Sequence, residues 1–178
     1  MSRTMYFFPF EDKTMDSGFV GEISAKTALH FIAPTLARKK FAYLWKIGKM
    51  SDTFASYTGN TDRIYVLGHC GPGDDDLSTG VITGTHTCST SELASYFFSH
   101  GLQQASRVHI RIHACNSGTS GGVGRPSFAE KLKEEMEHLG YNNVTVRGYL
   151  SGMGYYLICR EGETPFVNAS ASNNIVDF

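Results

Sequence analysis

A histidine and a cysteine, each placed among glycines at the end of a β-branched segment, are the residues best suited to chemistry in this chain. His69 follows the segment Arg63–Leu67, and Cys115 follows the segment Val108–Ala114. Gly68 and Gly71 lie beside the histidine, and glycines also follow the cysteine. A thiol with an imidazole is the minimum set for a cysteine nucleophile and its base. The pair therefore predicts nucleophilic catalysis, provided that the fold brings the two side chains together.

The segments before these two residues are predicted to be neighbouring parallel strands. Between them, Ser89–Glu92 supplies helix-capping residues, the apolar run Leu93–Phe98 follows, and Gly101 is suited to end a helix. A helical crossover joins parallel strands, so their carboxyl ends meet at one edge of the sheet. Open α/β folds place ligands and catalysis at that edge.

Composition limits the class of protein. The 178 residues fit one domain, and a net charge of −1 disfavours a nucleic-acid partner. No apolar run approaches the roughly 18 residues that span a membrane, and the N-terminus lacks a signal-peptide pattern. The four cysteines are irregularly spaced, which favours free thiols in a reducing compartment. We therefore expect a cytoplasmic protein, or one delivered into a host cytosol, without a membrane partner.

The rest of the chain predicts an α/β fold with a mainly parallel central sheet flanked by helices. Residues 71–76 are predicted to form a loop, a short hairpin is expected in the stretch that follows through residue 84, and the tail from residue 161 is polar. We expect one domain over residues 1–160 and a tail over 161–178 that is ordered in part against it. The other predicted elements are strands at 4–10, 107–114, 144–150 and 155–159, and helices at 26–46 (broken at Pro34) and 126–139.

The two segments resemble those of the caspase-like (clan CD) cysteine peptidases, and most of all the bacterial toxin-type self-processing peptidases. Members carry a histidine after one core strand in the setting h-h-G-H-G, and a cysteine after the next in the setting h-h-x-A-C-x-S-G. Here Val66–Gly71 reads V-L-G-H-C-G, and Ile112–Gly118 reads I-H-A-C-N-S-G. The histidine precedes the cysteine by 46 residues (115 − 69), close to the roughly 50 of caspases. The resemblance covers residues 60–150.

The resemblance implies a caspase-like three-layer sandwich and a cysteine endopeptidase that cleaves protein substrates, itself included, in the setting of a bacterial effector. Cys115 is then the nucleophile, and His69 is the general base and acid. The backbone N–H groups of Cys70 and Cys115 form the oxyanion hole. Most of the family has glycine where this chain has Cys70, so the role requires that Cys70 avoid a positive φ. No cofactor is required.

The resemblance also implies where the substrate side chain lies. The residue two before the nucleophile lines the pocket for the side chain that precedes the scissile bond, and here it is His113. A neutral imidazole would suit an uncharged or apolar side chain, whereas a protonated one would suit an acid. The opposite wall of the pocket falls on Ser151, Gly152 and Met153.

Other interpretations of the same residues stay open. The chain could be a catalytically inactive caspase-like interaction module, or an acyl-transfer enzyme that uses the same dyad. His69, Cys70, His86 and Cys88 could bind zinc, although they lack the C-x₂-C spacing of structural zinc sites. Relatives are activated by calcium or by inositol hexakisphosphate, for which Asp74–Asp76 and the basic stretch at 38–49 are the candidates. The oligomeric state is left open.

Overall fold

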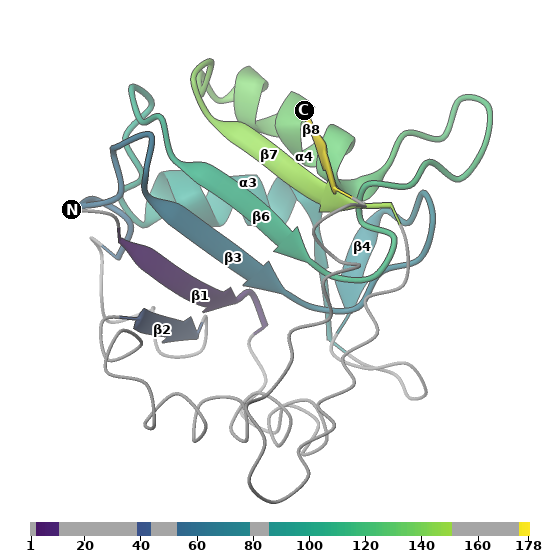
Figure 1. Cartoon of the computed structure of the whole chain (residues 1–178), viewed down its shortest axis with the longest axis horizontal. Helices are drawn as coiled ribbons and strands as arrows, with labels where there is room; N and C mark the ends of the chain where they lie inside the picture. The colour runs from purple at the N-terminus through teal and green to yellow at the C-terminus, as the bar shows by residue number, and fades with distance from the viewer. Residues whose placement is uncertain (1–2, 11–38, 44–52, 79–85, 151–174) are drawn as a thin grey trace, which may run out of the picture.

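The computed structural model describes residues 3–10, 39–43, 53–78, 86–150 and 175–178 (Figure 1). A six-stranded sheet in the order β2-β1-β3-β6-β7-β8 forms its centre, and every neighbouring pair is parallel except β7 and β8. The chain is thus α/β with a mixed, mostly parallel sheet. The strands are β1 (Thr4–Phe8), β2 (Lys39–Tyr43), β3 (Arg63–Leu67), β6 (His109–His113), β7 (Thr145–Tyr149) and β8 (Ile175–Asp177).

Two helices pack behind the sheet in the view of Figure 1. These are α3 (Thr90–Ser99) and α4 (Phe128–His138), and each begins with a capping box, formed by Ser89 with Glu92 and by Ser127 with Glu130. Such a box satisfies backbone N–H groups that the first turn leaves without partners. In the described segments no helix is long and apolar enough to cross a membrane.

Strands β3, β6 and β7 each have one apolar and one polar face. Successive strand residues point to opposite sides of the sheet, and in these strands the even-numbered side chains are buried on the apolar face. The odd-numbered positions of β3, β6 and β7 carry mainly polar and aromatic side chains, and most of these are partly buried. The fully buried even-numbered side chains are Ile64, Val66, Ile110, Ile112 and Val146.

A small antiparallel ladder lies beyond the carboxyl end of β3. It consists of β4 (Asp76–Ser78) and β5 (Thr87–Ser89), so the second strand of the predicted hairpin lies later in the chain than expected. β5 leads directly into α3. The ladder therefore connects the loop after His69 to the helix that crosses over to β6.

The predicted helix at 26–46 is wrong for residues 39–43. These residues form β2, an edge strand that pairs in parallel with β1. In so short a segment, apolar residues a few positions apart fit both the helical and the strand period. Pairing with β1 therefore decides that the segment forms a strand. The last residues of the predicted polar tail form β8, which pairs with β7. The predicted strand at 155–159 lies outside the described residues.

A buried carboxylate fixes the amino end of the sheet. Asp62, 1% exposed, accepts hydrogen bonds from the Arg3 side chain (Nη2 to Oδ2, 2.8 Å) and from the backbone N–H groups of Arg3, Thr58 and Gly59. Burial by itself raises the pKa of Asp62, but the hydrogen bonds from Arg3 and Gly59 outweigh it and hold that pKa below its ordinary value. The charged form is therefore the one that the fold stabilises.

Asp62→Asn is expected to lower the free energy of unfolding at neutral pH by about 2–3 kcal/mol, because a buried charged acceptor is lost. A lowered pKa means that the carboxylate contributes fully above its ordinary pKa and loses that contribution as pH falls through the folded value. The difference in unfolding free energy between wild type and Asp62→Asn, measured by urea titration, should therefore become smaller below about pH 4. Glu134→Gln, at an exposed position on α4, is the matched control. A difference in unfolding free energy that stays constant with pH would contradict this account.

Candidate active site

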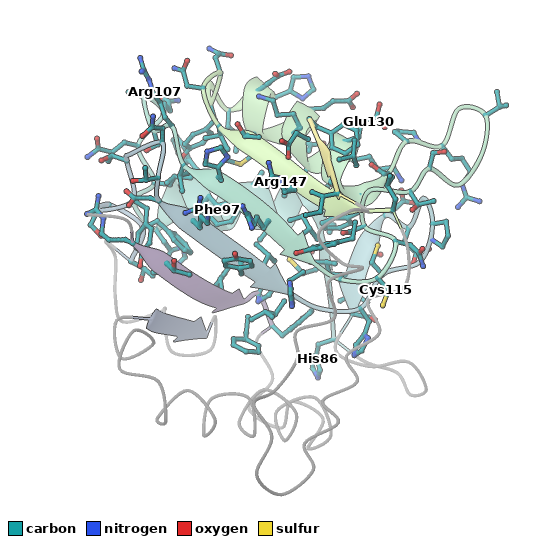
Figure 2. All side chains as sticks on the ribbon, in the orientation of Figure 1. His86, Phe97, Arg107, Cys115, Glu130 and Arg147 are labelled. Carbon is teal, nitrogen blue, oxygen red and sulfur yellow. The ribbon has the colours of Figure 1, made fainter. Side chains whose placement is uncertain are left out.

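His69 and Cys115 follow neighbouring strands at equivalent positions. β3 and β6 pair in parallel with a constant offset of 46 residues, from Arg63 opposite His109 to Leu67 opposite His113. The same offset separates His69 from Cys115, and each lies two residues beyond the last paired residue of its strand. Adjacent strands lie about 4.8 Å apart. Figure 2 shows Cys115 at this carboxyl end of the sheet.

The chain turns sharply after Cys115. Asn116 has φ +54°, the one positive φ among the described non-glycine residues, and asparagine tolerates that region better than most residues. Buried Ser117 then fixes the turn, because its hydroxyl donates to the carbonyl of Ile112 (2.9 Å) and accepts from the N–H of Tyr149 (3.1 Å). The turn is thus anchored to its own strand and to β7, which holds Cys115 at a defined position.

Two glycines allow this turn to approach β7 closely. A Cβ on Gly118 would lie 2.9 Å from the carbonyl carbon of Gly148, and a Cβ on Gly148 would lie 2.6 Å from the Cα of Gly118. The N–H of Gly118 donates to the carbonyl of Tyr149 (2.9 Å), and the N–H of Ala129 donates to that of Ser117 (2.9 Å). Gly118, three residues after Cys115, therefore allows this turn to pack closely against β7.

The segment after His69 is also fixed by its backbone. His69 exchanges two hydrogen bonds with Ser78 of β4, each 2.9 Å between N and O. The chain then turns through Gly71 to Asp74, whose Oδ2 accepts from the N–H of Gly71 (2.5 Å). Asp74 thus closes the turn that follows the histidine.

The loop after His69 and the loop after Cys115 contact each other directly. The N–H of Gly73 donates to the carbonyl of Thr119 (2.9 Å), and a Cβ on Gly73 would lie 2.5 Å from both Cα and N of Gly121. From α4, Lys131 Nζ donates to the carbonyls of Gly73 (3.0 Å) and Asp74 (3.3 Å) and pairs with the carboxylate of Asp75 (2.5 Å). These contacts hold the two candidate catalytic loops in one arrangement.

Cys70 meets the conformational requirement set by the sequence. It does not have a positive φ, and its backbone N–H donates to no residue in the described segments. Its partly exposed thiol donates to the carbonyl of Gly71 (3.2 Å). Burial, together with the charges of Asp74 and Cys115, raises the pKa of Cys70 to about 12, so this thiol is protonated at neutral pH.

His113 lies on the polar face between two tyrosines. Its ring makes edge-on contacts with Tyr65 and Tyr149, with centroids 5.8 Å away in both cases. Tyr65 in turn accepts a hydrogen bond from Arg111 (Nη1 to OH, 3.1 Å). His113 is the last residue of β6 and lies two residues before Cys115, as the sequence requires. Ser151, Gly152 and Met153 lie outside the described residues.

The acidic and thiol residues considered as metal ligands have other contacts. Asp74 and Asp75 bind Gly71 and Lys131, and the buried thiol of Cys88 donates to the carbonyl of Ser89 (3.6 Å). Within the described segments, no group of three His, Cys, Asp or Glu side chains is arranged to hold a metal ion. The basic stretch at 38–49 lies largely outside these segments.

The sequence did not single out Lys131, Ser117 or Asn116. Lys131 resembles any other lysine on a helix with many charged residues, and its three acceptors lie more than fifty positions away in the chain. In the sequence, Asn116 and Ser117 are simply the residues that follow the cysteine. Their local signal is an asparagine and a serine directly after a strand, which is typical of a turn.

Lys131→Met is expected to loosen the loop after His69. Losing these bonds at a side chain only 18% exposed should raise amide hydrogen exchange of Gly71 and of residues 73–75 roughly tenfold, which corresponds to about 1.4 kcal/mol. Lys133→Met is the control, because Lys133 lies on the same helix and donates to Val144 instead. Unchanged exchange in Lys131→Met, or an equal rise in both variants, would contradict the assigned role.

No protein-family model matches this sequence, and a search of curated proteins likewise finds no match.

Proposed function

We propose that this protein is a cysteine endopeptidase in which Cys115 and His69 act as a catalytic dyad. The observation that carries the proposal is the shared offset of 46 residues, because His69 and Cys115 each lie two residues beyond the last paired residue of adjacent parallel strands. The contacts between the two following loops support it, because they give the pair a fixed geometry. Preorganised groups are what such catalysis requires.

The chemistry follows from the positions. The Cys115 thiolate attacks the carbonyl carbon of the scissile bond, and His69 delivers a proton to the departing amine. Water then hydrolyses the thioester, with His69 acting as base. The developing oxyanion accepts hydrogen bonds from the backbone N–H groups of Cys70 and Cys115. Two observations support that assignment: Cys70 has no positive φ, and its N–H donates to no residue in the described part of the chain.

The substrate is proposed to be a protein or peptide, and no cofactor is needed for the dyad. His113 lines the pocket for the side chain before the scissile bond, with Tyr65 and Tyr149 as its neighbours. A pocket lined by two aromatic rings and an imidazole favours a large, uncharged substrate side chain at this position. The sheet is proposed to be the centre of a caspase-like sandwich, of which α3 and α4 supply one layer. A reducing compartment such as the cytosol keeps Cys115 a thiol.

The test is cleavage of a complex peptide library derived from a whole proteome. Wild type, Cys115→Ala and Cys88→Ala are incubated with the library, and new peptide ends are identified by mass spectrometry. The proposal expects new ends with wild type and Cys88→Ala, sharing one type of residue before the cut, and none with Cys115→Ala. Cleavage that persists in Cys115→Ala would overturn it, and so would an absence of cleavage by every protein across calcium and inositol hexakisphosphate additions.

A further inference from the structure

The turn after Cys115 lies in a notch on the surface of β7. Gly148 has no side chain, and a Cβ there would lie 2.6 Å from both Cα and N of Gly118 and 2.9 Å from the Cβ of Ala129. The turn therefore fills the space that a side chain at position 148 would need, and Ala129 of α4 forms one wall of the notch. The position of Cys115 thus depends on what else closes this notch.

Strand β8 closes the notch with Val176. In the antiparallel pairing of β7 with β8, Val176 is the partner of Gly148. A Cβ on Gly118 would lie 2.6 Å from Cγ1 of Val176, so this methyl group occupies the place that a side chain at position 118 would take. Val176 is partly buried there. A residue far along the chain therefore packs on a glycine that lies only three residues from the proposed nucleophile.

Several contacts hold β8 against β7. The backbone N–H of Phe178 donates to the carbonyl of Val146 (2.8 Å), and the N–H of Val146 donates to that of Phe178 (3.2 Å). Oδ2 of Asp177 accepts from Nη2 of Arg147 (2.5 Å), and the ring of Phe178 packs against the core. Val176 lies among these residues and therefore has a fixed position above the turn.

The turn needs such support because its backbone is strained. Asn116, directly after Cys115, has φ +54°, a conformation that a non-glycine residue keeps only where its surroundings impose it. The hydroxyl of Ser117 fixes the turn from within through its two hydrogen bonds. Val176 closes the turn from outside by packing on Gly118. Without that contact, Asn116 can relax toward a negative φ, and the backbone of Cys115 moves with it.

We propose that Val176 is a positioning residue, which acts on catalysis by holding the turn that presents Cys115. The inference rests on the proposed dyad, because it gives Val176 a part in the same reaction. A nucleophile displaced by about 1 Å can lose about a hundredfold in rate, so a partial loosening of the turn should lower kcat measurably. The proposed substrate pocket around His113 lies on the polar face of the sheet, whereas Val176 and its partner Gly148 lie on the other face. Substrate binding should therefore not change.

The test replaces Val176 by alanine in the full chain and follows the turn by amide hydrogen exchange, measured by NMR. The N–H of Gly118 is the first reporter, because it donates to the carbonyl of Tyr149 (2.9 Å). The N–H of Thr119 is the second, because it donates to the carbonyl of Asn116 (2.8 Å). Val176→Ala is expected to raise the exchange rate of both amides at least about fivefold, while the amides of β3 exchange as in wild type.

Peptide cleavage supplies a readout that a purely structural role would not change. On a peptide taken from the library screen, Val176→Ala should lower kcat about fivefold or more and leave KM within about twofold of wild type. Val176→Thr keeps the shape of the side chain and should restore kcat and both exchange rates to within about twofold of wild type. Val123→Ala removes the same two methyl groups from a fully exposed residue and should change neither readout.

Three results would overturn the proposal. The first is exchange of Gly118 and Thr119 that Val176→Ala leaves unchanged. The second is an equal rise in Val123→Ala or in the amides of β3, which would indicate general loosening. The third is faster exchange of the turn with an unchanged kcat, which would make Val176 a structural residue only. A wild type that cleaves no peptide would instead overturn the dyad, and the exchange rates would still show whether Val176 holds the turn.

Discussion

Peptide cleavage is expected to fall by about 10³–10⁴-fold or more when either Cys115 or His69 is replaced by alanine, with the thermal unfolding of both variants close to that of wild type. Losing one member of a nucleophile–base pair costs nearly as much as losing both, because the two act as a unit. The double variant should therefore be no slower than the slower single variant. The measurement is kcat/KM on a peptide taken from the library screen.

Matched variants separate this expectation from general damage to the site. Cys88→Ala removes a thiol that is buried beside β4, and His86→Ala removes an exposed histidine that lies at the same end of the molecule as Cys115 (Figure 2). Both should retain at least about half of the wild-type kcat/KM, an effect well under 1 kcal/mol. If His86→Ala lost activity and His69→Ala kept it, the base would be misassigned.

The second large effect is expected at Gly73. Alanine there would meet both a positive φ of +69° and a Cβ position 2.5 Å from backbone atoms of Gly121. Strain from the φ costs about 1–2 kcal/mol, and the clash forces the two loops apart. We expect Gly73→Ala to destabilise the protein by about 3–4 kcal/mol and to lower peptide cleavage by more than tenfold.

Gly124 provides a close control for Gly73. Its φ is +72°, but a Cβ there would meet no atom within 4 Å, so alanine adds the backbone strain without the clash. Gly124→Ala should cost only about 1–2 kcal/mol and leave cleavage nearly unchanged. The difference between the two variants in urea denaturation therefore reports the contact between the loops. Equal effects in both would contradict the role assigned to that contact.

The local parts of this fold were predictable from the sequence. Two runs of β-branched residues ending in glycine-flanked His69 and Cys115 indicated adjacent parallel strands, and the pairing of β3 with β6 confirms that arrangement. Ser89 and Glu92 indicated the start of α3 and form the expected capping box. These signals lie within a few residues of the feature that they determine, so a single sequence carries them.

The parts that depend on distant partners were not predictable. Lys39–Tyr43 has no pattern that distinguishes a strand from a helix, and it becomes β2 through pairing with β1. Likewise, Ile175–Asp177 is too short to indicate a strand, yet it pairs with β7 and places Asp177 against Arg147. Lys131 reaches the loop after His69 across 57 and 58 positions of chain. Local propensity carries no information about such contacts.

The most direct test of the catalytic pair is labelling of the intact protein with a peptidyl electrophile, followed by mass spectrometry. Reagents that differ in their terminal side chain are compared on wild type, Cys115→Ala and His69→Ala. The proposed dyad predicts one adduct on wild type, at Cys115, with a rate that depends on the terminal side chain, at least tenfold slower labelling of His69→Ala, and none on Cys115→Ala. An adduct that persists in Cys115→Ala, or equal rates in wild type and His69→Ala, would contradict it.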